Sequence, residues 1–186
     1  MAKDLNKMTT DELGQLFPIF IVDYNPDWPR IALIESRKIV KAVGKNVVTR
    51  IEHIGSTAIP GLCAKPTIDL LLEIFEFTNC DLLIKQLHKI GYHFIPKPEN
   101  PKPHMMFAKG YSESGINGQT FHIHLRYPGD WDEIVFRDYL RSNYDAALNY
   151  SDLKRVLADN YVNDREKYTD NKTDFINRVI RLARLK

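Results

Sequence analysis

The chain has 186 residues, of which 44% are hydrophobic and 27% are charged, a composition typical of a single globular domain. A formal net charge of +2 excludes the strong overall basic field that predicts nucleic-acid binding. No apolar segment reaches the roughly 18 residues of a membrane span, and the polar start is unlike a signal peptide. Cys63 and Cys80 fit no zinc or disulfide framework, so we expect a soluble cytoplasmic protein with reduced thiols.

The first part of the chain is predicted to alternate between strands and helices. Residues 1–18 are polar and form an N-terminal extension, and residues 19–186 form one domain. The apolar entry of IFIVDYNPDWP predicts a short strand, after which Pro29 opens a helix that Gly44 ends. VVTRIEHI predicts a strand, and TIDLLLEIFEF predicts a second strand that is covered on both faces. NCDLLIKQLHKIG predicts an amphipathic helix that stops at Gly91.

The rest of the chain is predicted to add two strands and a helical layer. A Pro-rich connector precedes a short strand around Met105 to Ala108, SESGING is a turn, and TFHIHLRY alternates as a strand. From Trp131 onward there is no glycine or proline, and helical periodicity predicts two or three packed helices. This order predicts an α+β (mixed α/β) fold with a helical C-terminal layer.

The loop after the first of the two central strands is a candidate anion site. Gly55 permits a tight turn or a close approach to a ligand, and free amides beside the hydroxyls of Ser56 and Thr57 can bind an anion. Lys65 could add positive charge to a bound phosphate. The alternative is a plain cap, because any strand-to-helix turn can contain these residues.

Asp69 stands inside an apolar strand, where an ionised carboxylate is costly to bury unless it is paired or coordinates a metal. Alternation places Asp69, Leu71 and Glu73 on one face of the strand. Glu73 would lie roughly 13 Å from Asp69, too far for both carboxylates to hold one ion directly. The alternative places Asp69 at an exposed strand end, where it pairs with an arginine.

The strand FHIHLRY presents His122, His124 and Arg126 on one face and apolar side chains on the other. Two imidazoles spaced in this way can approach one divalent ion, and an imidazole can also act as a general base near neutral pH. The alternative is a solvated polar face. His53, next to the Gly-Ser loop, is either a further site residue or a structural histidine.

The predicted C-terminal helices carry basic and aromatic side chains that could reach an anionic ligand: Arg137, Arg141, Tyr168 and Lys172. Most charges on such helices are merely solvated, so these residues decide nothing by themselves. Tyr168 and Lys172 are expected to line a cleft between the sheet and the helices. Nearly balanced charge favours a small-molecule or nucleotide ligand over nucleic acid, and the sequence does not specify the oligomeric state.

Five segments of the chain resemble the GrpB family in their order and spacing. They are YNPDWP, IEHIGSTAIPGLCAKPTIDLLL, HIHL, FRDYLRSN and DREKYTDNKTDFI, which together run from about residue 20 to the C-terminus. The resemblance implies a nucleotidyltransferase-like fold of the polymerase-β superfamily, with a central mixed sheet flanked by helices. It also implies that Gly55 and Ser56 form a turn that opens a helix and cradles a triphosphate, and that Asp69 is the first metal carboxylate.

The chain departs from that superfamily pattern at two places. The second carboxylate is expected at position 71, where the chain has Leu71, and TFHIHLRY lacks a third carboxylate where His122 and His124 stand. If the histidines replace the missing acids, the resemblance implies a metal-dependent nucleotidyl or phosphoryl transferase acting on a small molecule. In this hypothesis Asp69, His122 and His124 hold a divalent Mg, Mn or Zn ion, and Asp69 and His124 are catalytic.

The same hypothesis takes a nucleoside triphosphate as substrate and assigns its binding to Gly55, Ser56, Thr57, Lys65, Arg126, Tyr168 and Lys172. The alternative implied by the resemblance is a catalytically degenerate module that binds a nucleotide or phosphometabolite. Leu71 favours this alternative, because the loss of one carboxylate weakens a two-metal site. GrpB-like domains are sometimes fused to dephospho-coenzyme A kinase, which suggests coenzyme A or nucleotide metabolism as the setting.

Overall fold

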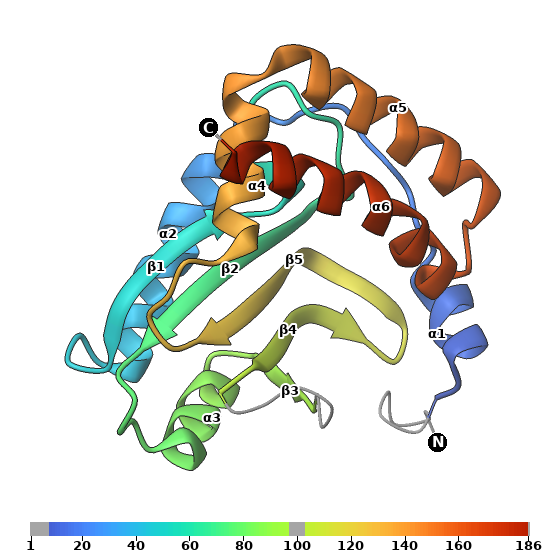
Figure 1. Ribbon diagram of the computed structural model, residues 1–186. Coiled ribbons are helices and arrows are strands. Elements are labelled where there is room, and N and C mark those ends of the chain that lie inside the picture. The colour runs from blue at the N-terminus through green and yellow to red at the C-terminus, as the bar shows by residue number, and fades with distance from the viewer. Residues whose placement is uncertain (1–7, 97–102, 186) are drawn as a thin grey trace.

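The computed structural model describes residues 8–96 and 103–185 and contains a five-stranded mixed sheet with helices on both sides (Figure 1). In space the strands follow the order β1-β2-β5-β4-β3, in which β2 and β5 are parallel and the other neighbours are antiparallel. The strands are β1 (Val48–Ile54), β2 (Thr67–Ile74), β3 (His93–Ile95), β4 (Met105–Ser112) and β5 (Gly115–Arg126). The predicted α+β (mixed α/β) class is therefore confirmed.

Six α-helices accompany the sheet in the described part of the chain: α1 (Thr10–Leu16), α2 (Trp28–Val43), α3 (Cys80–Lys89), α4 (Asp132–Ser142), α5 (Tyr144–Asn160) and α6 (Arg165–Arg184). Helices α2 and α3 cover one face, where Ile39 and Leu87 join the buried side chains of Leu70, Leu72 and Ile123 in the main core. No helix of the described residues is both long enough and apolar enough to cross a membrane.

Helices α4 to α6 form the predicted C-terminal layer on the opposite side of the sheet (Figure 1). Arg137 of α4 donates to Glu52 of β1 at 2.8 Å, and Glu52 pairs in register with Leu71 on the face that also carries Asp69. A second apolar cluster joins this layer to the segment after β1: Ile59, Leu62, Phe136, Leu140, Tyr150 and Val179. The face that carries Asp69 therefore lies beneath the C-terminal helices.

Four local predictions need correction or completion. Residues 19–24 form no strand and contribute only an isolated bridge between Val22 and Ala64, because the turn before α2 ends the extended segment. SESGING is only partly a turn, since β5 already begins at Gly115. Strand β3 was not predicted, and helix α2 begins one residue before Pro29. Most of the predicted Pro-rich connector lies outside the described residues.

The described part of the predicted N-terminal extension forms helix α1, which packs on the domain. Thr9 and Glu12 cap its first turn reciprocally, a known helix-start pattern. A Cβ atom at Gly14 would lie 1.8 Å from the carbonyl oxygen of Asn163, so only glycine permits this approach to the α5–α6 connection. The ring of Phe17 meets the ring of Tyr111 edge-on, with centroids 5.1 Å apart.

Candidate functional site

The turn after β1 brings the backbone against Asp69. Gly55 has φ 70°, and a Cβ atom there would lie 2.6 Å from Oδ2 of Asp69. Glycine is therefore required both for the left-handed conformation and for the close approach. The helix that the family resemblance implies after this turn is a single turn of 3₁₀ helix, Ser56–Ala58.

Asp69 and the two histidines meet because β2 and β5 are parallel neighbours, with Asp69 in register with His122 and Leu71 in register with His124. Asp69 Oδ1 lies 3.1 Å from Nδ1 of His122 and 3.5 Å from Nε2 of His124. One nitrogen or oxygen atom of each side chain lies within 4.8 Å of the others. Within residues 8–96 and 103–185, no other group of His, Cys, Asp or Glu side chains meets this condition.

The protonation states of this cluster suit a metal ligand set. Burial alone would raise the pKa of Asp69, but hydrogen bonds with His122 and His124 outweigh burial and hold that pKa well below its ordinary value. Burial lowers the pKa of His122. Near neutral pH the carboxylate is therefore ionised and the His122 imidazole is neutral, which are the forms that bind a metal ion. The alternative that Asp69 pairs with an arginine at a strand end is excluded.

Tyr111 of β4 extends the cluster beyond the two central strands. Its hydroxyl lies 3.0 Å from Nε2 of His122, and the two rings stack with an interplanar angle of 10°. When Nδ1 of His122 donates its hydrogen to Asp69, Nε2 accepts from the tyrosine hydroxyl; with a metal ion on Nδ1, Nε2 would instead donate to the tyrosine oxygen. Tyr111 can therefore partner either tautomer of His122, a contact that the sequence analysis did not identify.

The other acidic side chains on this face already form hydrogen bonds and ion pairs with other residues. Leu71, which stands where a second carboxylate is expected, is fully buried. Glu73 accepts from Nε of Arg50 at 2.9 Å and from the amide of Gly129 at 3.3 Å, and Glu52 is paired with Arg137. The described geometry supports one metal ion and not two.

Two lysines interact electrostatically with Asp69, Lys65 and Lys172 of helix α6, and the charge of Arg165, also on α6, acts on both lysines. Burial lowers the pKa of Lys65 to about 7 and that of Lys172 to about 8, and the charge of Asp69 opposes both shifts. In the part of the chain that the structure describes, none of the three forms an ion pair with a carboxylate. Half-buried cations of this kind suit a phosphate group. Arg165 was missed by the sequence analysis.

The hydroxyl groups of the turn already have partners inside the protein. Thr57 is buried and donates to the carbonyl of Thr67 at 3.2 Å, so its oxygen accepts from Nε2 of His53 at 2.9 Å. Burial lowers the pKa of His53 to about 4, which keeps this ring neutral. Ser56 hydrogen-bonds the buried phenol of Tyr150. His53 therefore has the structural role that the sequence left open.

Some predicted ligand-binding residues lie apart from the cluster. Arg126 is 3.5 Å from Glu133 and stacks over Trp131 at the far end of β5. Tyr168 is buried, and Nζ of Lys172 lies 4.0 Å above the centre of its ring. Tyr168 therefore contacts the amino group of Lys172 with its ring, and it is too buried to form much of a cleft wall. Arg141 donates to the carbonyl of Ala58 at 2.8 Å and holds the turn.

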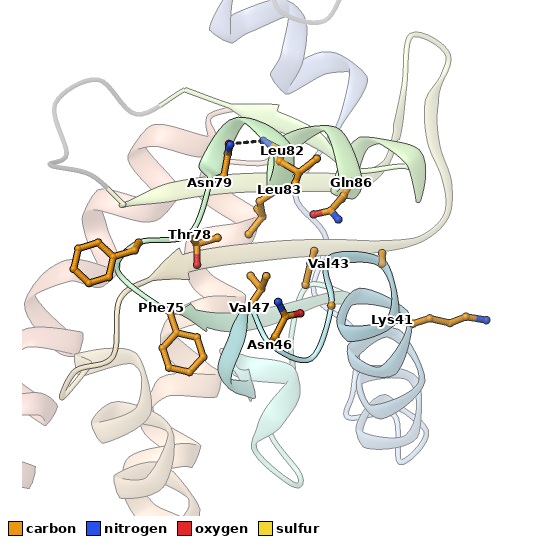
Figure 2. A pocket seen from close by; sticks show the side chains of 13 residues that line it. Lys41, Val43, Asn46, Val47, Phe75, Thr78, Asn79, Leu82, Leu83 and Gln86 are labelled. Carbon is orange, nitrogen blue, oxygen red and sulfur yellow. Dashed lines mark hydrogen bonds between the residues drawn. The ribbon is translucent and has the colours of Figure 1, made fainter.

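A cavity of about 1000 Å³ lies next to the cluster, between α1, the strands β3 and β4, and the start of α6. His122 and Arg165 both line it, so the cavity borders the metal-ligand cluster at His122 and the basic side chains of the site at Arg165. A separate hollow of about 540 Å³ lies between the end of α2 and the start of α3 (Figure 2). Its lining includes Phe75, Leu82 and Lys41 but no His, Cys, Asp or Glu, so we assign no metal chemistry to it.

A family model described as GrpB protein matches residues 18–182. The chain belongs to the GrpB family. It is 32% identical over 176 residues to a UPF0157 protein of Halalkalibacterium halodurans, with 92% of this chain and 87% of the relative covered. The crystal structure of the conserved protein GrpB from Enterococcus faecalis superposes with a TM-score of 0.76 at 30% identity, and covers 88% of this chain and 96% of that one.

More distant similarities confirm the fold of this GrpB-family chain. The Cid1 poly(U) polymerase with MgGTP bound superposes with a TM-score of 0.50 at 14% identity, over 75% of this chain and 43% of that one. The predicted nucleotidyltransferase-like fold is therefore confirmed. A dephospho-CoA kinase of Mycolicibacterium paratuberculosis is 26% identical over 173 residues, which cover 81% of this chain and 42% of that protein.

Proposed function

We propose that the protein is a metal-dependent transferase of nucleotidyl or phosphoryl groups that acts on a small molecule. The observation that carries this proposal is the meeting of Asp69, His122 and His124 directly against the Gly55 turn. Two imidazoles and one carboxylate suit Zn²⁺ or Mn²⁺ better than Mg²⁺, and three protein ligands leave positions open for a substrate. When bound, the ion would supply Lewis-acid stabilisation of a phosphate oxygen.

The surrounding residues would bind and orient the phosphate chain. Lys65, Arg165 and Lys172 have no carboxylate partner among the described residues, so a phosphate would not have to displace an ion pair there. The Gly55 turn supports the approach of backbone amides to an anion. His124 is the more exposed histidine, with 26% of its side chain accessible against 12% for His122. Because it is accessible, His124 can act either as the third metal ligand or as the base that accepts the proton of the attacking hydroxyl.

Replacing Asp69 with asparagine tests the proposal, because it removes the charge of the cluster and keeps its shape. We expect Zn²⁺ and Mn²⁺ affinity, measured by calorimetry, to fall at least about 100-fold, since the carboxylate is a direct ligand. Metal-dependent binding of nucleoside triphosphates should disappear with it. Asp81→Asn, an exposed change in α3, serves as the control and should leave both unchanged. Unaltered metal affinity in Asp69→Asn would remove the basis of the proposal.

Tyr111→Phe is expected to weaken metal binding about tenfold while the ligand set stays complete. The phenylalanine ring can still stack on His122, but Nε2 of the imidazole loses the oxygen to which it would donate when Nδ1 binds the ion. The measurement is a calorimetric titration with Zn²⁺ on folded protein, checked by circular dichroism. Tyr144→Phe, at an exposed position of α5, is the matched control. Equal affinities in Tyr111→Phe and wild type would show that the tyrosine hydroxyl does not support metal binding by His122.

The second candidate is a binding module that retains the site without turnover. Buried Leu71 in place of a second carboxylate favours it, because most of the chemistry of this fold class uses two ions. The similarity to a dephospho-CoA kinase supports coenzyme A or nucleotide metabolism as its proposed setting. Release of pyrophosphate from a nucleoside triphosphate by wild type, lost in Asp69→Asn, would decide for the enzyme. Metal-dependent binding without any release would decide for the module.

A further inference from the structure

The cavity beside the metal-ligand group is lined by both apolar and polar side chains. Aromatic and other apolar side chains form most of its body: Leu13, Phe17, Ile95, Met106, Ala108 and Tyr111. Hydroxyl and charged groups occur at Thr10, Ser112, Glu113, Ser114, Arg165 and Glu166. A cavity of about 1000 Å³ is at the upper end of the range for small-molecule sites, and mixed walls of this kind bind amphipathic organic ligands.

Two residues connect this cavity to the proposed phosphate site. His122 contributes one wall and contacts Asp69 through its other side. Arg165 also lines the cavity, and its charge acts on Lys65 and Lys172, which lie by the Asp69 carboxylate. One ligand can therefore place an anionic end among the cations and an organic end in the cavity.

We propose that the cavity between α1, β3, β4 and the start of α6 holds the planar, aromatic part of a phosphorylated ligand whose phosphates lie at the metal-ligand group. This inference rests on the proposed function and specifies the substrate class of the same site. The aromatic rings of Phe17 and Tyr111 offer flat and edge contacts to a heterocycle. The serine hydroxyls and Glu113 offer acceptors for N–H groups or sugar hydroxyls.

Helix α1 gives the cavity a wall that lies before residue 18, the first residue of the family match. Thr10, Leu13 and Phe17 come from this segment, and Figure 1 shows α1 beside the start of α6 and the β4–β5 hairpin. The phosphate end of the site uses residues inside the family match, whereas part of the organic end does not. The two ends can therefore be altered separately.

The test compares a probe for the phosphate end with probes for the whole site, using the full chain saturated with Mn²⁺. Inorganic tripolyphosphate is the first probe, and ATP, GTP, CTP and UTP are the second set, all titrated by calorimetry. In wild type we expect at least one nucleoside triphosphate to bind about tenfold or more tightly than tripolyphosphate, since stacking of one base contributes that much. Tripolyphosphate should bind equally well with or without changes in the cavity.

Leu13→Trp narrows the cavity at its α1 wall, and Gln15→Trp adds the same side chain at an exposed position of α1 that does not line it. We expect Leu13→Trp to lose the tenfold advantage of the nucleotide and Gln15→Trp to keep it. Ser114→Trp, at the exposed tip of the hairpin, gives a second cavity variant if Leu13→Trp does not fold.

Retention of the nucleotide advantage in a folded cavity variant would overturn the inference, as would equal wild-type affinities for tripolyphosphate and all four nucleotides. In both cases metal-dependent tripolyphosphate binding would still support the proposed function. If wild type bound neither tripolyphosphate nor any nucleotide, the proposed function would fail and the inference with it.

Discussion

Gly55→Ala is expected to abolish metal binding and to destabilise the protein by about 3 kcal/mol. The new methyl group would lie 2.6 Å from Oδ2 of Asp69, which has to move away from the two histidines. The φ of 70° adds backbone strain, because an L side chain disfavours the left-handed region. Calorimetric titration with Zn²⁺ measures the binding, and urea unfolding measures the loss of stability.

Gly61→Ala separates the strain from the collision. Gly61 has a similar φ of 76°, but a Cβ atom there meets nothing within 4 Å. We expect this variant to lose about 1 kcal/mol of stability through strain alone and to keep wild-type metal affinity. If both alanine variants bound Zn²⁺ as wild type does, close contact between the turn and Asp69 would be irrelevant to the site.

The elements that the sequence predicted well are those with strong local signals. Helix α2 follows from its apolar spacing together with Pro29 and Gly44, and β5 follows from the strict alternation of FHIHLRY. Strand β3 has only three residues, too few for a period to show. The extended segment near Val22 has strand-like composition but finds only one bridging partner, Ala64. Local pattern specifies whether a segment is extended, and tertiary pairing decides whether it becomes a strand.

The candidate site was predicted in its residue types and not in its assembly. Alternation assigns Asp69 to one face of its own strand, and it places His122 and His124 together on one face of theirs. Their meeting depends on the parallel pairing of β2 with β5, which joins residues 53 positions apart and leaves no local trace in the sequence. The same applies to Tyr111, whose role comes from the antiparallel neighbour β4.

Pairing within the protein determines which basic residues remain available to bind a ligand. Arg137, Arg141 and Arg126 look equivalent to Lys172 in the sequence, yet the structure gives each arginine a hydrogen-bonding partner within the protein. The amino groups of Lys65 and Lys172 form no ion pair with a carboxylate in the described part of the chain. Sequence spacing cannot show this difference, because each partner comes from a distant element.

Lys154 of α5 is a buried cation on the C-terminal layer, with only 2% of the residue exposed. Its amino group donates to the carbonyl of Cys63 and lies 4.7 Å from the ring centre of Tyr150. Burial lowers the pKa of Lys154 from 10.5 to about 7. In the unfolded chain the amine keeps its ordinary pKa. At pH values between about 7 and 10.5 the unfolded state therefore binds more protons than the folded state.

The free energy of unfolding is therefore expected to rise with pH above about 7, and Lys154 should contribute about 2 kcal/mol of this rise between pH 7 and pH 9. Lys65 and Lys172 have lowered pKa values of about 7 and 8 and act in the same direction. In Lys154→Met the rise should become smaller by about the lysine's share, because methionine has no proton to lose. Urea unfolding at pH 7, 8 and 9 measures this, with the exposed Lys85→Met as control. An unchanged pH slope in Lys154→Met would mean that Lys154 stays protonated when buried, held by the Cys63 carbonyl and the Tyr150 ring.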